Sequence, residues 1–143
     1  ALPIWFLPAL TNRARMLTAG MVFAVLAAAL HVLIFYMESI AWEGALARKT
    51  FGGTPEEVRP HAFYAFNQGF YNLFLALQAI IGVVLAALGY AAIGAALILA
   101  GTGAMLAAAV VLALASAPHR SAAAKQGTFP LLAVVCTLAA LLG

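Results

Sequence analysis

The sequence predicts an all-α fold, an integral membrane bundle of four transmembrane helices that forms a single domain over residues 1–143. The first observation is composition: 66% of the residues are hydrophobic and 8% are charged, whereas soluble proteins average about 45–50% and 25%. The second is the presence of four long apolar segments, each able to cross a hydrocarbon core about 30 Å thick. These four spans leave no room for a soluble catalytic domain.

The first sixteen residues are predicted to lie outside the bundle. Their apolar part is interrupted by Pro3 and Pro8 and is too short to span a membrane. Trp5 and Phe6 suit a segment at the level of the lipid headgroups. We therefore interpret residues 1–16 as an interfacial segment, or in part as a remnant of processing or cloning.

The first transmembrane helix is predicted over residues 17–42 and ends at Trp42 in the aromatic belt. His31 then lies near the middle of the bilayer, and Glu38 lies about 11 Å from the middle at 1.5 Å per residue. A carboxylate inside the apolar slab costs about 2.5–3.5 kcal/mol on insertion scales. Glu38 is therefore a candidate functional residue whose partner has to be found.

Residues 43–62 form the predicted loop, with a short helix near residues 55–59. Thr54 and Glu57 have the spacing of a capping box, and Pro55 occupies the first helical position. Glu56 and Glu57 are therefore interpreted as charges of a first helical turn.

The remaining transmembrane helices are predicted over residues 63–88, 91–115 and 121–142. The second has an unusually polar first half for a lipid environment. The third is uncharged and carries small residues every four positions, which is typical of close helix packing: Ala96, Ala100, Ala104 and Ala108. The fourth contains Pro130, which should kink it.

The distribution of positive charge predicts the orientation. Five basic residues flank the two connections after the first and third helices, and two, Arg13 and Arg15, lie on the opposite side. The positive-inside rule then places both connections in the cytoplasm and both termini outside. The leading arginines of the first helix favour the opposite orientation. We expect a multi-pass protein of a bacterial inner membrane.

Helical spacing at about 100° per residue sorts the polar residues into faces. His31, Glu38 and Trp42 share one stripe of the first helix. Asn67 and Tyr71 share a stripe of the second helix, with Asn72 displaced to its side. Counting from the loop-side surface places residues of the first, second and fourth helices at a similar depth: Glu38, Asn67 and Lys125, with Asn72 and Gln126 slightly deeper.

These positions suggest a polar pocket inside the membrane. Glu38 and Lys125 are either direct partners or members of one site, with His31 at its floor. Glu38 and His31 are the candidate catalytic acid and base. The candidate ligand-binding residues are Asn67, Tyr71, Asn72, Lys125, Gln126 and Trp42.

Structural roles compete with each of these interpretations. Asn, Gln and Tyr side chains commonly fasten helices together, at about 0.6 kcal/mol per interhelical hydrogen bond. Lys125 could simply extend its ammonium group to the membrane surface. His31 is not expected to bind a metal, since the nearest acid on its face is about 10.5 Å away along the helix. No pattern indicates a metal site or a cofactor.

Several motifs resemble the small four-helix membrane-protein family known as domain of unknown function 1304. The resemblance covers about residues 17–142, and its most specific block is Asn67-Gln-Gly-x-Tyr-Asn72. The other matching motifs are His31-x-x-Ile-x-Tyr-x-Glu38-x-x-x-Trp42, Lys-Thr-Phe51-Gly and Lys125-Gln126-Gly. The family pattern has a glutamate before the histidine, where this chain has Leu30. The resemblance implies four helices and supplies no activity.

The reading that we favour is a membrane protein that holds a hydrophobic small molecule or lipid in a polar pocket, with acid–base, isomerase-like chemistry as an added possibility. The first alternative is a proton-coupled transporter that works as a homo-oligomer, because one bundle can scarcely enclose a transport path. The second is a non-catalytic scaffold or subunit. The expected partners are therefore the lipid bilayer and an apolar ligand. Nucleic acid is excluded, because the basic residues are scattered and form no basic face.

Overall fold

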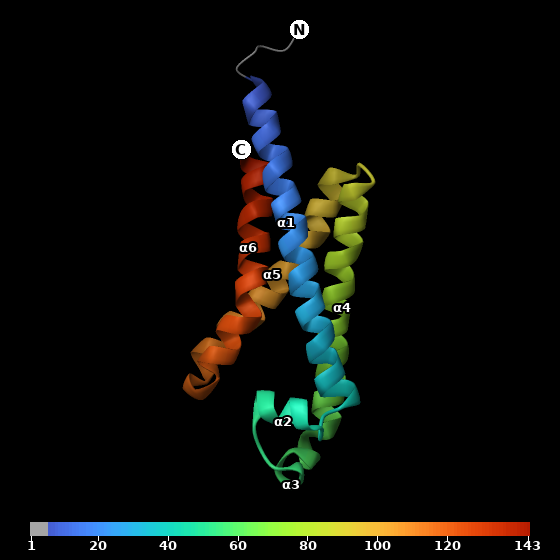
Figure 1. Ribbon diagram of the computed structural model, residues 1–143, viewed down its shortest axis with the longest axis vertical. Coiled ribbons are helices and arrows are strands. Elements are labelled where there is room, and N and C mark those ends of the chain that lie inside the picture. Colours follow the sequence, from blue (N-terminus) through green and yellow to red (C-terminus); the bar gives the residue numbers. More distant parts are fainter. Residues whose placement is uncertain (1–5) are drawn as a thin grey trace.

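The computed structural model describes residues 6–143, and the described chain is almost entirely helical (Figure 1). Four of its helices are long and apolar enough to cross a membrane, which confirms the predicted four-helix transmembrane bundle. In chain order the elements are α1 (Phe6–Phe35), a π-helix η1 (Tyr36–Ile40), α2 (Ala45–Phe51), α3 (Pro55–Val58), a 3-10 helix η2 (Arg59–His61), α4 (Ala62–Ala87), α5 (Ala91–Ala115), a 3-10 helix η3 (Ala117–His119) and α6 (Arg120–Leu142).

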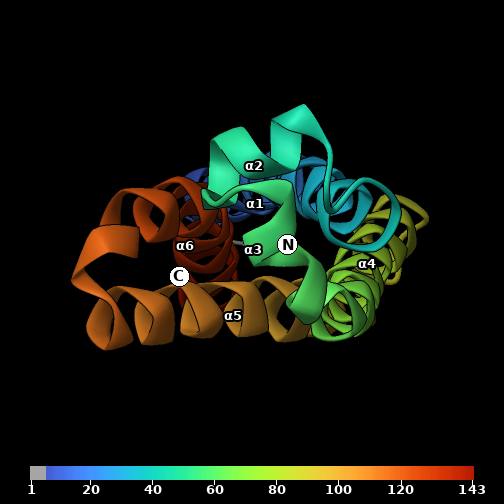
Figure 2. The ribbon, with the colours of Figure 1, turned by 90° about the horizontal axis from the view of Figure 1, so that it is seen from below.

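The four long helices form a ring in the order α1, α4, α5, α6. Helix α1 packs against α4 and α6, and α5 packs against the same two helices from the opposite side. Figure 2 looks along the bundle and shows α2 and α3 lying across the end where α1 leads into the loop. The loop therefore covers one end of the bundle.

Helix α1 begins earlier than residue 17. It starts at Phe6, so residues 6–16 continue the first helix and do not form a separate interfacial segment. Pro8 is tolerated because it lies in the first turn, where backbone N–H groups have no helical partner. Pro3 and Trp5 lie outside the described residues.

The last turn of the first span is a π-helix, which the sequence pattern did not predict. The backbone N–H of Ala41 donates to the carbonyl of Tyr36, five residues earlier, at 2.9 Å. This turn buries Met37 and Glu38. Helical geometry therefore ends at Ile40, two residues before Trp42.

The π-helical turn is held against α4 by a close approach. Ser39 Oγ donates a hydrogen bond of 2.7 Å to the carbonyl of Phe66. Gly69, one turn further along α4, faces the same serine, and a Cβ built on Gly69 would overlap Ser39 Oγ. Glycine is therefore the residue that lets the two backbones come this close.

The loop contains the predicted capping box and one further helix. Thr54 and Glu57 bond to each other's backbone N–H groups at the start of α3, as expected. Helix α2 was not predicted. Its Ala47 is buried in a small apolar cluster with Ile34 and Met37, and this contact holds α2 on the end of the bundle.

Two contacts join the ends of this loop. Trp42 Nε1 donates to the carbonyl of Val58 at 2.8 Å. The neighbouring Glu43 carboxylate accepts two hydrogen bonds from the Arg59 guanidinium, at 3.0 and 3.1 Å. The hydrogen bond from Arg59 lowers the pKa of Glu43 below its usual value. The first and last residues of the loop are thus held close together at the end of the bundle.

Helices α4 and α5 pack through glycines. A Cβ on Gly82 would come within 2.8 Å of the Gly94 carbonyl oxygen, and a Cβ on Gly94 within 2.6 Å of the Gly82 carbonyl oxygen. The alanines that recur every four residues are not the packing face, which corrects that expectation: Ala96, Ala100, Ala104 and Ala108 are all exposed. The buried side of α5 is Gly94, Ala95, Ile98, Gly101, Thr102, Met105 and Ala109.

Pro130 lies inside α6 and is buried. Proline has no N–H, so the carbonyl of Gln126 lacks its usual helical donor four residues later. Figure 1 shows the first turns of α6, which precede this proline, inclined away from α1 and α4. The bundle is therefore more open at the end that the loop covers.

Candidate functional site

A cavity of about 430 Å³ lies at the loop end of the bundle, with walls from all four long helices. Its apolar lining residues are Ile34, Phe51, Ala65, Leu75, Ala108, Leu112 and Ala122. Its lining residues with polar groups are His31, Glu38, Trp42, His61, Tyr64, Gln68, Asn72, His119 and Gln126. All three histidines of the chain therefore face one cavity.

Glu38 is held in this cavity by Asn72. Glu38 is 6% exposed as a residue, and its Oε2 accepts a hydrogen bond of 2.8 Å from Asn72 Nδ2. The same Nδ2 group donates to the carbonyl of Gln68 at 3.2 Å. A carbonyl and a carboxylate both accept, so the two contacts together fix which side of the Asn72 amide is the nitrogen.

His31 lies on α1 seven residues before Glu38 and is 3% exposed. Its Nδ1 lies 2.9 Å from the carbonyl oxygen of Ala27. Because a carbonyl oxygen can only accept, Nδ1 carries the hydrogen, and Nε2 of the neutral ring is an acceptor. The imidazole is thus oriented by its own helix.

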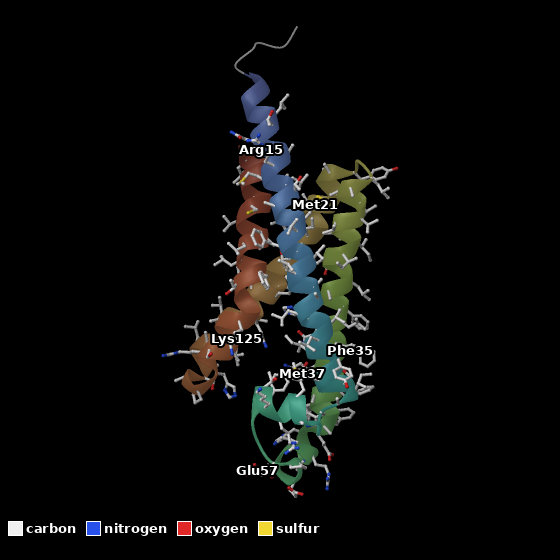
Figure 3. All side chains as sticks on the ribbon, in the orientation of Figure 1. Arg15, Met21, Phe35, Met37, Glu57 and Lys125 are labelled. Atoms are coloured by element: carbon white, nitrogen blue, oxygen red, sulfur yellow. The ribbon has the colours of Figure 1, made fainter. Side chains whose placement is uncertain are left out.

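The expected pairing of Glu38 with Lys125 is wrong. Within residues 6–143 the recorded ion pair is that of Glu43 with Arg59, and the partner of Glu38 is Asn72. Lys125 is exposed and does not line the cavity. Figure 3 shows Lys125 on the inclined first turns of α6, where its charge can remain at the surface.

The predicted face of α4 is also wrong. Asn67 and Tyr71 are exposed, and α4 presents a different stripe to the cavity: Ala65, Gln68, Asn72 and Leu75. The reason is that small residues determine which side of α4 can approach α1 and α5, and the buried ones are Ala65, Gly69, Ala76, Ala79 and Gly82. Most of the bulky aromatic side chains of α4 are correspondingly turned outward, and those at least half exposed outside the cavity lining are Phe63, Phe66, Tyr71 and Phe74.

The structure therefore brings five of the predicted site residues together and leaves three outside. Those that line the cavity are His31, Glu38, Trp42, Asn72 and Gln126, and those outside it are Asn67, Tyr71 and Lys125. The sequence interpretation missed Phe51, His61, Tyr64, Gln68 and His119. The spacing of Ala65, Gly69 and Ala76 was a signal for the correct face of α4, and it places Gln68 on that face.

The arrangement can bind a polar group through Glu38 and an apolar body through the surrounding side chains. It offers a carboxylate and imidazoles as proton acceptors in the lining of one cavity. Among the described residues, no group of three or more His, Cys, Asp and Glu side chains is placed to hold a metal ion.

Comparison with protein families gives a match over most of the chain. The family model described as "Protein of unknown function (DUF1304)" matches residues 25–138. Comparison with curated proteins and with solved structures gives no match. The matched range contains every residue that lines the cavity.

Proposed function

Starting from the fact that this chain belongs to the DUF1304 family of proteins of unknown function, we propose that it holds a hydrophobic small molecule or lipid in an intramembrane pocket. The observation that carries the proposal is a cavity built around a buried carboxylate, Glu38, which one amide from another helix holds in place. The identity of the membrane, a bacterial inner membrane, remains a prediction from the sequence.

The size and lining of the cavity support a ligand. Ligand pockets commonly measure about 300–1,000 Å³ and combine apolar walls with a few oriented polar groups. The cavity of about 430 Å³ falls within this range. Leu75, Leu112 and Phe51 supply apolar surface, while the carboxylate of Glu38 supplies an oriented polar group.

The position of Glu38 supports function over simple helix fastening. Glu38 belongs to an apolar span, Ala9–Ile40, where an acid is costly to insert. The Asn72 amide also donates to a backbone carbonyl of its own helix, and a neutral acceptor such as glutamine at position 38 could accept the bond that joins the two helices. A neutral side chain at position 38 would serve helix packing equally well. A role in ligand binding explains why an acid is present there.

Acid–base chemistry would be an extension of binding. Glu38 and His31 line the same cavity, so one could take a proton from a bound molecule while the other returns one. This extension requires both groups to reach the same ligand.

Native mass spectrometry of protein extracted from membranes in mild detergent tests the binding proposal. We expect wild-type protein to carry a co-purifying apolar molecule, and Ala122→Phe to lose it, because Ala122 lines the cavity and the larger side chain would occupy part of it. The matched control is Ala124→Phe, since Ala124 is exposed on the same helix and does not line the cavity. Absence of a bound mass in the wild type, or equal retention in both variants, would contradict the proposal.

The same proteins separate the alternative functions. Proton movement in proteoliposomes that depends on the identified ligand, and that Glu38→Gln abolishes, would instead favour a transporter. A loss of thermal stability in Glu38→Gln without any bound ligand in the wild type would favour a scaffold.

A further inference from the structure

We propose that the pocket selects ligands whose polar group is positively charged, namely organic amines or quaternary ammonium compounds that carry an apolar body. This inference rests on the proposed function, because it names the chemical class that the same pocket would take.

The charge of the lining is the first argument. Within the described chain the cavity is lined by one carboxylate, that of Glu38, and by no lysine or arginine. Glu38 accepts a hydrogen bond from Asn72 but forms no ion pair with any of residues 6–143. A buried carboxylate is stabilised when an opposite charge supplies the missing counter-ion. A ligand cation would do this, whereas an anionic ligand would find no fixed cation in the lining.

The second argument is that two polar lining side chains, His31 and Asn72, have committed their donors and each leave an acceptor free. Asn72 uses its nitrogen on Glu38 and on the Gln68 carbonyl, so its amide oxygen remains. His31 uses Nδ1 on Ala27, so Nε2 remains as an acceptor in the neutral ring. The side-chain amides of Gln68 and Gln126 can donate as well as accept, so they favour neither sign of charge. Acceptors suit a ligand that donates hydrogen bonds or carries positive charge.

The aromatic lining is the third argument. Trp42, Phe51 and Tyr64 line the cavity, and the rings of Trp42 and Phe51 lie 5.7 Å apart. The indole N–H is committed to the Val58 carbonyl, so Trp42 can offer its ring to a ligand but not this donor. Aromatic faces attract ammonium groups, tryptophan most strongly.

The remaining titratable lining groups are His61, Tyr64 and His119. Protonated imidazoles would repel a cationic ligand, so binding is measured at a mildly alkaline pH. His119 is also close to Ser116, with Nδ1 and Oγ 2.6 Å apart.

Calorimetry on the full chain in lipid nanodiscs tests the proposal with three probes of one size class. Benzyltrimethylammonium carries the charge, neopentylbenzene is its neutral isostere, and 4-phenylbutyrate is an anionic counterpart; empty nanodiscs correct for partition into lipid. We expect the ammonium probe to bind at least about tenfold more tightly than the neutral isostere, since a desolvated cation–aromatic contact alone is worth this much. The comparison uses wild-type protein and therefore does not depend on how well a variant folds.

Two variants locate the selectivity. Glu38→Gln should remove the preference for the ammonium probe while neopentylbenzene still binds. Glu43→Gln makes the same change of charge on an exposed loop residue outside the cavity and should leave the preference intact.

Each other outcome overturns the inference. Equal binding of the charged and neutral probes, abolished by Ala122→Phe, would refute the selection of cations and leave the ligand pocket standing. A preference for 4-phenylbutyrate, or a preference for the ammonium probe that survives Glu38→Gln, would refute it in the same way. Failure of all three probes to bind would count against this inference alone if native mass spectrometry still shows a bound apolar molecule, and against both proposals if it does not.

Discussion

Asn72 Nδ2 on α4 lies 2.8 Å from Oε2 of Glu38, which sits in the π-helical turn after α1. The bond joins residues 34 apart in sequence and connects two spans at the wall of the cavity. Within residues 6–143 Asn72 is the hydrogen-bond partner of the Glu38 carboxylate, so the position of the acid depends on this contact. π-Helical turns often occur at functional sites, because the extra residue redirects side chains.

Asn72→Leu should destabilise the protein by about 1–3 kcal/mol, because the buried Glu38 carboxylate would lose its donor. Thermal unfolding in mild detergent measures the change. Asn67→Leu is the matched control, since Asn67 is exposed on the same helix and should change stability by no more than about 0.5 kcal/mol. Equal effects of the two substitutions would show that the contact with Glu38 contributes nothing.

Gly69→Ala should destabilise the protein by about 1–3 kcal/mol, because the new Cβ would overlap Ser39 Oγ and force the π-helical turn away from α4. Gly103→Ala is the control, because nothing lies within 4 Å of a Cβ at that position. Alanine there should leave stability unchanged or raise it by up to about 1 kcal/mol through its better helix propensity. The measurement is again the unfolding midpoint, and a neutral Gly69→Ala would refute the close approach.

Trp42→Phe should loosen the loop, because the Val58 carbonyl would lose the indole donor. The expected cost is about 0.5–1.5 kcal/mol, together with faster hydrogen exchange in α2 and α3. Phe51→Leu, which removes the ring beside Trp42 but keeps the indole hydrogen bond, should accelerate this exchange less. If Phe51→Leu has the larger effect, the ring contact and not the hydrogen bond closes the loop.

Thr137→Val should stabilise the protein by about 1 kcal/mol or more, because Thr137 Oγ1 is buried and has no hydrogen-bond partner among residues 6–143, and such a group is costly to desolvate. Thr102→Val is the contrasting substitution: that hydroxyl is also fully buried, but it donates to the Ile98 carbonyl at 2.6 Å. It should bring no gain. Thermal unfolding of both variants in the same detergent measures the two changes in stability. If Thr137→Val is less stable than the wild type, the Thr137 hydroxyl has a hydrogen-bond partner and the prediction is wrong.

The Glu43–Arg59 pair should give a small dependence of stability on pH. The hydrogen bond from Arg59 lowers the pKa of Glu43 in the folded protein, so its stabilising contribution is present above the pKa of the unfolded chain. It is lost as the pH falls through the lower pKa of the folded state. Arg59→Gln should therefore raise the pKa of Glu43 towards its ordinary value.

Carboxyl-carbon NMR of Glu43 through an acid titration measures this shift. Lys49→Gln removes a positive charge from the same loop and is the control, since the recorded hydrogen bonds of Glu43 come from Arg59. A Glu43 titration that Arg59→Gln leaves unchanged would show that the pair does not persist in solution.

Much of the architecture follows from sequence because it depends on local and periodic signals. The third span was predicted over residues 91–115 and is α5, Ala91–Ala115. The capping box of Thr54 and Glu57 was also predicted and forms. Both depend on signals within a few residues of the element that they define.

Other parts of the fold could not be predicted in this way. The π-helical turn depends on Ser39 meeting a carbonyl of α4, and α2 depends on burial of Ala47 against α1. These are contacts between segments distant in sequence, so no local pattern encodes them. The start of α1 was misplaced because Pro8 was interpreted as an interruption, although a first helical turn accommodates proline.

The site was predicted only in part, because some of its residues stand out locally and others depend on contacts between distant segments. His31 and Glu38 stand out because polar groups in an apolar helix are rare. On α4, however, polar residues occur on several sides, and the prediction followed Asn67 and Tyr71. The buried face is determined by backbone proximity, which small residues such as Gly69 permit. Side-chain polarity alone could not choose between the two faces.

The joined ends of the loop make it a site for a topology reporter. Trp42 meets Val58 and Glu43 meets Arg59, so a peptide epitope inserted between Gly52 and Gly53 would lengthen the loop without pulling α1 and α4 apart. Both glycines are exposed, and exposed loop tips tolerate insertion. Antibody access to that epitope in sealed vesicles of known sidedness would then establish beneath which membrane surface the cavity lies.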